Sequence, residues 1–239
     1  HEFPKPVVVL ADGVTMGGGL GLAAGADLVI ATERTRMGLP ESRIGFFPDV
    51  GATGWLFEKC PPGYPEFLAL TGYEIQGPEC RRLGLATDMA ASSRLPVILA
   101  ALKKFPLRLP KNRSAAANLL RAELAVLLEP PQTASCDLDQ WVADHFQGRK
   151  TLGEITASLA TCNLDSLICR EVFDRLAERS PTALALTLEL LRRNEGQPLM
   201  QVFANEAQAA AFMIRHPDYL EGIRARLLDK DDQPRWSPR

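Results

Sequence analysis

A glycine-rich turn between two apolar runs constrains this chain more than any other feature. Residues 7–10 and 28–31 are short, apolar and rich in β-branched side chains, which is typical of strands in a sheet covered on both faces. Between them lie the turn, residues 13–19, and a run of small residues at 20–26 that predicts a tightly packed helix. This order of strand, turn, helix and strand is a βαβ-type unit, so we expect an α/β fold.

The pattern changes from mixed α/β to all-helical along the chain. We expect a short edge strand at 87–90, a helix over 94–104, and then a linker at 106–113 that is rich in proline and basic residues. Beyond the linker only helical patterns follow, so we divide the chain into a core, 1–105, and a helical region, 106–239. Further helices are expected over 52–59, from Pro65, from Pro78 to Gly84, and over 138–146, 152–160, 164–178, 181–193 (with Ser180 as N-cap), 199–214 and 219–228.

The glycine-rich turn suits an anion. Glycines let backbone N–H groups approach a ligand closely, and the start of a helix adds a positive partial charge. A bound phosphate and an oxyanion formed during a reaction both fit such a turn, and so does a purely structural role in close helix packing. The spacing matches neither the P-loop nor the dinucleotide fingerprint, because Leu22 occupies the place of the third glycine.

Together these residues resemble the crotonase superfamily. The run Lys5-Pro6 to Gly13 is similar to the family's strand, and the triplet at 17–19 is similar to its Gly-Gly-Gly turn. The resemblance implies a crotonase-like ββα superhelix that holds an acyl-CoA thioester carbonyl in an oxyanion hole. It also implies that the Gly18 N–H donates to the oxyanion, with Met16 and Gly17 beside it at the substrate.

A second block resembles the 3-hydroxyisobutyryl-CoA hydrolase branch. Hydratases carry one glutamate two residues after the glycine triplet, and here that place is Gly21. Their other glutamate has a match in Pro40-Glu41, and Phe47-Pro48-Asp49-Val50-Gly51 follows as in the hydrolases. Ala52 departs from the branch, which usually has a second glycine there. The likeness also covers the run 215–236, spans about 1–105 and 180–236, and is weak over 106–165.

The family has a substantial part before its Lys-Pro strand that this sequence does not contain. By the resemblance, that part would hold the first strands, the second oxyanion donor and much of the CoA-binding surface. We therefore expect the missing N-terminal segment to act as a partner of this chain, and we expect a possible homo-oligomer. The chain begins His1-Glu2-Phe3 without a methionine.

Thioester hydrolysis places definite demands on the residues. A CoA thiol leaves readily, because its pKa is near that of cysteine, about 8.5, so a hydrolase can work without a second glutamate. We predict that Glu41 attacks the carbonyl or activates water, and the sequence leaves both roles open. Asp49 would orient the substrate's hydroxyl group or the water, and two nearby carboxylates would raise one pKa.

The resemblance and the composition together limit the alternatives. We expect hydrolysis of 3-hydroxyisobutyryl-CoA in valine catabolism; the alternatives are a hydratase or isomerase that uses Glu41, and a non-catalytic acyl-CoA-binding protein. CoA is then part of the substrate, and no separate cofactor and no metal are expected. We expect a cytoplasmic protein if it is bacterial and a mitochondrial matrix protein if it is eukaryotic.

Charge and cysteine content exclude further classes. The net charge of −2 argues against a nucleic-acid partner, and the six glycines and Asp27 within residues 13–32 argue against a membrane span. The five cysteines show no C-x-x-C pair and predict free thiols. We expect residues 229–232 to form a structural or interface turn rather than a metal site. The side chains that could meet CoA phosphates are Arg34, Arg36, Arg43, Lys103 and Lys104.

Overall fold

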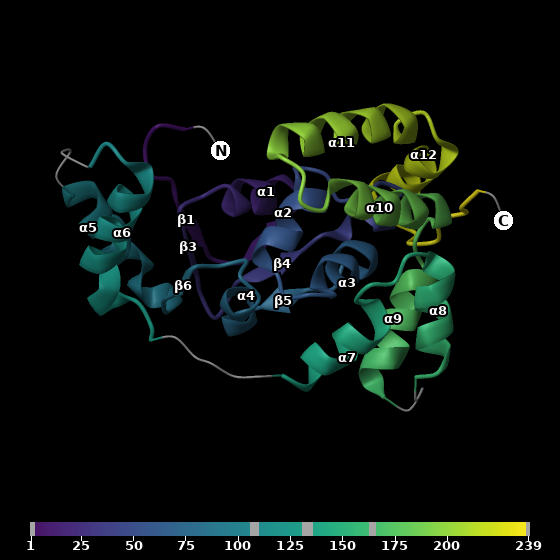
Figure 1. Cartoon of the computed structure of the whole chain (residues 1–239), viewed down its shortest axis with the longest axis horizontal. Coiled ribbons are helices and arrows are strands. Elements are labelled where there is room, and N and C mark those ends of the chain that lie inside the picture. Colours follow the sequence, from purple (N-terminus) through teal and green to yellow (C-terminus); the bar gives the residue numbers. More distant parts are fainter. Residues whose placement is uncertain (1–2, 106–109, 131–135, 163–165, 238–239) are drawn as a thin grey trace. The chain divides into compact units, whose positions relative to one another are not determined.

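The computed structural model describes residues 3–105, 110–130, 136–162 and 166–237 (Figure 1). The chain forms two compact units that interleave along the sequence. The first unit comprises residues 1–37 and 75–134, and the second comprises residues 38–74 and 135–239. The predicted division into 1–105 and 106–239 rests on the change of sequence pattern. These units do not test it, so it stays a prediction.

The first unit contains the expected parallel sheet. Strand β3 (Leu28–Ala31) is buried throughout and lies between β1 (Val8–Ala11) and β6 (Asp88–Met89). Val8 is in register with Leu28, and Ile30 with Asp88. Helix α1 (Gly18–Ala24) makes the crossover from β1 to β3 and is built from glycine, alanine and leucine. The predicted βαβ unit is therefore confirmed, and its strands lie within one residue of their expected places.

The first unit also contains a second, smaller sheet and several helices. A small second sheet has the order β2-β4-β5, with β4 and β5 antiparallel. Its strands are too short to leave a pattern in the sequence. Part of the predicted linker, residues 106–109, lies outside the described residues. The remaining elements are β2 (Val14–Met16), β4 (Arg36–Gly38), β5 (Ile75–Gln76), α4 (Pro78–Arg82), η2 (Ser92–Arg94), α5 (Leu95–Lys104), α6 (Arg113–Leu124) and η3 (Ala125–Leu127).

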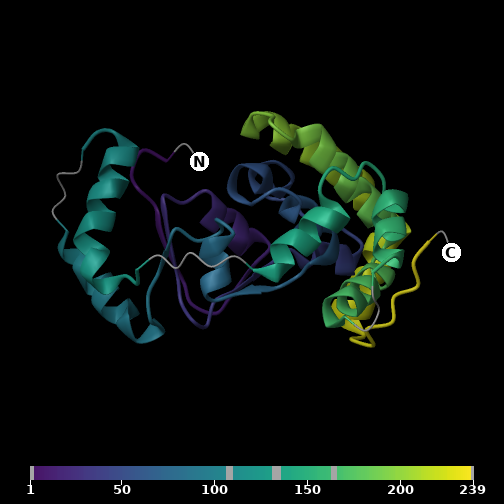
Figure 2. The ribbon, with the colours of Figure 1, turned by 60° about the horizontal axis from the view of Figure 1, so that its bottom comes forward.

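The second unit is helical, and its caps agree with the sequence. Ser180 accepts a hydrogen bond from the Ala183 N–H, which confirms it as the N-cap of α10. Helices α10 and α11 pack side by side (Figures 1 and 2). The predicted last helix begins earlier and ends in a π-helical turn, and residues 164–165 of another predicted helix lie outside the described part. The elements are η1 (Pro40–Ile44), α2 (Ala52–Lys59), α3 (Tyr64–Thr71), α7 (Asp137–Phe146), α8 (Leu152–Ala160), α9 (Leu167–Ala177), α10 (Pro181–Asn194), α11 (Leu199–Met213), α12 (Pro217–Ile223) and η4 (Arg224–Leu228).

An aromatic cluster forms part of the core of this unit. Phe67 is fully buried on α3 and packs edge-on against Trp141 and Phe146 of α7.

The prediction that all five cysteines are free thiols is wrong for one pair, because Cys162 and Cys169 form a disulfide between α8 and α9. Their Cα atoms are 6.2 Å apart, a separation that a disulfide spans. The spacing of seven residues matches no common motif, so the sequence did not indicate the bond.

Candidate active site

The glycine-rich turn exposes the start of α1. Gly17 is the N-cap, with φ 52° and ψ −128°, a conformation that only glycine adopts readily. The first hydrogen bond inside the helix runs from the Gly21 N–H to the Gly17 carbonyl, at 3.0 Å. The N–H groups before Gly21 have no acceptor within the helix. Apart from the neighbouring residues and the helix's own backbone, no atom of the described residues lies within 4 Å of where a Cβ of Gly18 would be, so the backbone at Gly18 is open to a ligand.

Glu41 lies in η1, a 3₁₀ turn that begins with Pro40 and ends at Gly45. Its side chain is 9% exposed, and its Oε2 atom is buried with no hydrogen-bond partner among the described residues. The pKa of Glu41 is raised to about 8, mainly by burial and additionally by the charge of Asp49, against a lowering by the local backbone. A carboxyl group with a pKa near neutrality is suited to proton transfer.

Asp49 lies in the turn that precedes α2. This turn contains two successive left-handed residues, Val50 (φ 57°) and Gly51 (φ 79°). Such a conformation is costly for a β-branched residue like Val50. The indole N–H of Trp55 donates to the Val50 carbonyl at 3.1 Å and helps to fix it. Asp49 is less buried than Glu41, and burial raises the pKa of its carboxyl too, though less.

A buried carboxylate, Glu206 of α11, stabilises this turn through hydrogen bonds. It is 4% exposed and accepts hydrogen bonds from the Gly51 N–H (2.8 Å), the Thr53 N–H (3.3 Å) and the Thr53 hydroxyl (2.7 Å). These N–H groups belong to the start of α2, where a negative charge is favourable. The pKa of Glu206 is raised, because burial outweighs the lowering effect of its three hydrogen bonds.

Two buried asparagines extend the contact. The Asn194 amide donates to the Thr53 hydroxyl at 2.8 Å, and the Asn205 amide donates to the Asn194 side-chain oxygen at 2.6 Å. Sequence reasoning missed this network, because its members are separated by up to 155 residues. One signal was available: Asn205-Glu206 interrupts the otherwise apolar buried face of α11.

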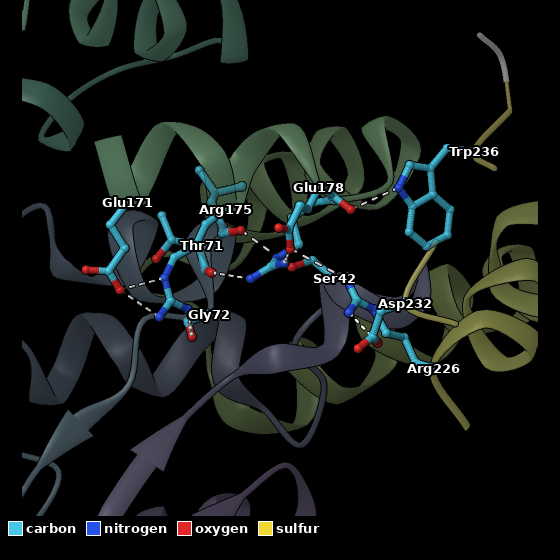
Figure 3. A network of polar contacts seen from close by, with 11 residues as sticks. Ser42, Thr71, Gly72, Glu171, Arg175, Glu178, Arg226, Asp232 and Trp236 are labelled. Carbon is cyan, nitrogen blue, oxygen red and sulfur yellow. Dashed lines mark hydrogen bonds and ion pairs between the residues drawn. The ribbon is translucent and has the colours of Figure 1, made fainter. Parts of the chain in front are cut away.

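Another polar network lies around Ser42, the residue after Glu41 (Figure 3). Ser42 is fully buried. Near it, the guanidinium groups of Arg175 and Arg179 donate to the carbonyls of Gly72 and Thr71, at 3.2 and 2.9 Å. The C-terminal segment joins this network, because the Trp236 indole N–H donates to the Glu178 carbonyl at 3.0 Å (Figure 3). These contacts tie the end of α3 to α9 and to the C-terminal segment.

The acidic turn at 229–232 has a structural role, as predicted. Asp229 and Asp231 both bind the Arg224 guanidinium at 2.6 Å, and Asp232 binds Arg226. Within the residues that the structure describes, no group of three or more His, Cys, Asp or Glu side chains is placed to hold a metal ion. Among the same residues, no helix is both long enough and apolar enough to cross a bilayer.

The structure brings the two predicted carboxylates together within one unit. Glu41 and Asp49 lie in the second unit and are close enough for the charge of one to act on the other. Met16, Gly17 and Gly18 belong to the first unit, and their joint action with the carboxylates stays a prediction.

The basic side chains proposed for CoA phosphates are exposed. Arg34 lies 3.6 Å from Asp12 in an ion pair and donates to the Ser92 hydroxyl at 3.5 Å. The role of the other four stays a prediction: Arg36, Arg43, Lys103 and Lys104.

Comparisons with known proteins find similar sequences over nearly the whole chain. A family described as enoyl-CoA hydratase/isomerase matches residues 1–239. A 3-hydroxyisobutyryl-CoA hydrolase of Gallus gallus is 33% identical over 98% of this chain and 60% of its own length. A small ribosomal subunit protein, mS47 of Arabidopsis thaliana, is also 33% identical, over 99% of this chain and 58% of its own.

A solved structure agrees as well. The crystal structure of a carnitinyl-CoA dehydratase from Mycobacterium thermoresistibile superimposes with a TM-score of 0.82 at 31% identity. The match covers 99% of this chain and 64% of that one. The predicted crotonase-like fold and the predicted family are therefore confirmed. The chain spans about 60% of the length of the curated relatives it matches.

Proposed function

Because the chain belongs to the enoyl-CoA hydratase/isomerase family, the crotonases, we propose that the protein hydrolyses a short-chain 3-hydroxyacyl-CoA, 3-hydroxyisobutyryl-CoA, to the free acid and CoA. One observation carries this proposal: Glu41 is buried, its Oε2 has no hydrogen-bond partner among the described residues, and the charge of Asp49 acts on it, while the place of a second hydratase glutamate is taken by Gly21. The 33% identity to a hydrolase supports the same choice.

The proposed reaction uses Glu41 as a base or as a nucleophile. As a base, Glu41 takes a proton from water, the water oxygen bonds to the acyl carbon, and the carbon–sulfur bond breaks. The CoA thiolate leaves and receives a proton. Asp49 orients the water or the substrate's hydroxyl group, and the Gly18 N–H donates to the oxyanion. One such donor contributes about 3–4 kcal/mol to the transition state. The second donor is expected from a segment that precedes this sequence.

Two other functions each have an observation in their favour. A hydratase or dehydratase reaction is favoured by the similarity to a carnitinyl-CoA dehydratase, and by the raised pKa of Glu41, which would let its protonated carboxyl act as an acid. A non-catalytic role is favoured by the similarity to the ribosomal protein mS47. We place these behind hydrolysis because Gly21 removes one of the two hydratase carboxylates.

The test is release of free thiol from 3-hydroxyisobutyryl-CoA by the natural full-length protein. We expect steady thiol release, reduced about 1,000-fold in Glu41→Gln because a group that transfers a proton is lost. Asp49→Asn should retain more activity than Glu41→Gln. Thiol release at the background rate, or full activity in Glu41→Gln, contradicts hydrolysis by Glu41. Loss of crotonyl-CoA absorbance without thiol release favours the hydratase.

The cellular setting follows from the same proposal. We propose a place in valine catabolism, in the mitochondrial matrix if the protein is eukaryotic and in the cytoplasm if it is bacterial. The mitochondrial hydrolase among its relatives supports the first setting. A homo-oligomer is also proposed.

A further inference from the structure

Two glycines bring α12 directly against the backbone of the Glu41 turn. A Cβ on Gly222 of α12 would lie 2.6 Å from the Cα of Ile44, the last residue of η1. A Cβ on Gly45, which ends η1 with φ +66°, would lie 2.6 Å from the carbonyl carbon of Asp218 in α12. Neither position has room for a side chain, so the contact is one of backbone against backbone. It involves two elements more than 170 residues apart in the sequence.

Helix α12 is itself held in place. Asp218 is fully buried and accepts hydrogen bonds from the Ser180 hydroxyl, at 2.5 Å, and from the Ser237 N–H, at 2.7 Å. The rings of Tyr219 and Phe46 extend the contact, with centroids 5.3 Å apart. On another side of η1, the buried Ser42 lies against the end of α3. The turn is therefore enclosed by α12 and α3.

This enclosure matters for Glu41 because hydrogen bonds hold its carboxyl group only in part, through the local backbone. Its Oε2 has no hydrogen-bond partner among the described residues, so the position of this oxygen depends on the backbone of the turn and on the packing around it. Burial is the main cause of the raised pKa of Glu41, and the charge of Asp49 adds to it. The ionisable groups on the elements packed against η1 are Tyr64 and Glu66 of α3, Asp218, Tyr219 and Glu221 of α12, and Arg224 and Arg226 of η4.

We propose that Gly222 and Gly45 are positioning residues for the Glu41 carboxyl group. Their close backbone contact fixes the η1 turn and keeps water away from the carboxyl. The catalytic consequence rests on the proposed function, whereas the effect on the burial of Glu41 does not.

Gly222→Ala tests the contact, with Gly153→Ala as its matched control. Both glycines lie in helices, and neither has a positive φ. Alanine favours a helix over glycine in both cases. At Gly153 the nearest atom to a new Cβ is 3.8 Å away, so only the Gly222 variant forces η1 to move. A displacement of about 1 Å can lower a rate about 100-fold.

Two readouts are measured on the natural full-length protein. In Gly222→Ala we expect kcat for thiol release to fall 10-fold to 100-fold with a KM changed by less than about 3-fold, because the reacting group and not the CoA site is displaced. We also expect the pKa of Glu41, followed by carboxyl carbon NMR, to fall from about 8 toward 4.5 as water reaches it. Gly153→Ala should change neither quantity.

The NMR readout separates the two proposals. If the protein releases no thiol but the pKa of Glu41 falls in Gly222→Ala, the positioning inference stands and the proposed function fails. If kcat and the pKa of Glu41 both match the wild type in a folded Gly222→Ala protein, the inference is overturned. Should Gly222→Ala fail to fold, Tyr219→Leu decides: it loosens the contact with Phe46 without a clash, and an unchanged pKa of Glu41 there overturns the inference.

Discussion

The turns that carry Glu41 and Asp49 lie eight residues apart in the sequence and are held in opposite ways. The Glu41 turn is enclosed by backbone packing through Gly45 and Gly222, and its carboxyl Oε2 lacks a hydrogen-bond partner among the described residues. The Asp49 turn is held by hydrogen bonds to a buried carboxylate, Glu206, and its own carboxyl is partly exposed.

This difference shows how two carboxyl groups can have different surroundings and therefore different roles. Burial disfavours the charged form of a carboxyl group, whereas contact with water favours it. Environments that push two pKa values apart are typical of an acid–base pair in an active site. On this reasoning we predict that Glu41 is the group that exchanges a proton and that Asp49 orients the water or the substrate.

The largest expected effect is on stability and comes from the buried carboxyl of Glu41. Its pKa is raised from 4.5 to about 8 on folding, so the folded state binds the proton more tightly than the unfolded state. The group therefore costs no stability below pH 4.5 and progressively lowers stability as the pH rises to 8, by about 1.4 kcal/mol per pH unit. In urea unfolding, Glu41→Gln should match the wild type near pH 4 and exceed it by on the order of 4 kcal/mol at pH 8 and above.

That prediction has a direct control. Glu58 lies on the exposed side of α2, so Glu58→Gln should leave the pH dependence of unfolding unchanged. A difference between Glu41→Gln and the wild type that stays constant from pH 4 to pH 8 would contradict a buried, protonated Glu41.

The next largest effect comes from breaking the polar support of the Asp49 turn. Glu206→Ala removes the acceptor for three hydrogen bonds and leaves buried donors of Gly51 and Thr53 unpaired. We expect the free energy of unfolding to fall by about 2–3 kcal/mol. Gln208→Ala, at an exposed position of the same helix, should change it by less than about 0.5 kcal/mol. Equal stability of the two variants would show that the network does not support the turn.

A smaller effect is expected from the Thr53 hydroxyl. It donates to Glu206 and accepts from Asn194, so Thr53→Val should lower the free energy of unfolding by about 1–2 kcal/mol. Urea unfolding measures the change. If Thr53→Val costs as much in the Glu206→Ala background as in the wild type, the two side chains do not act together.

The smallest effect comes from the charge of Asp49, which acts on the carboxyl group of Glu41 in the other turn. Asp49→Asn removes the charge that adds to the raised pKa of Glu41. Because burial is the larger cause, we expect the pKa of Glu41 to fall by less than about one unit. The acid limb of the kcat profile should move to lower pH by the same amount. A pKa of Glu41 that drops to 4.5 in Asp49→Asn would make the charge, and not burial, the main cause.

The sequence predicted local features well and distant ones poorly. The strands at 28–31, the helices at 52–59 and 152–160 and the Ser180 cap are set by short patterns of apolar side chains and capping residues. The Glu41–Asp49 pair was predicted from a motif, and the structure brings the two together. The cause of the raised pKa was only partly predicted: the sequence favoured two adjacent carboxylates, whereas burial comes first.

Contacts between distant segments left no such pattern. Glu206 reaches Gly51 across 155 residues, and Gly222 reaches Ile44 across 178. A glycine in a helix or a buried acid in an apolar helix signals some tertiary contact, but not its partner. Strands of two or three residues and the Cys162–Cys169 bond depend on packing in the same way.

One measurement tests most directly whether the surroundings of the two turns give their carboxyl groups different pKa values. Carboxyl carbon NMR would titrate Glu41 and Asp49 together in the natural full-length protein. The account predicts a pKa of about 8 for Glu41, with Asp49 titrating at clearly lower pH. Titration of both groups near pH 4, as in an unfolded chain, would contradict it.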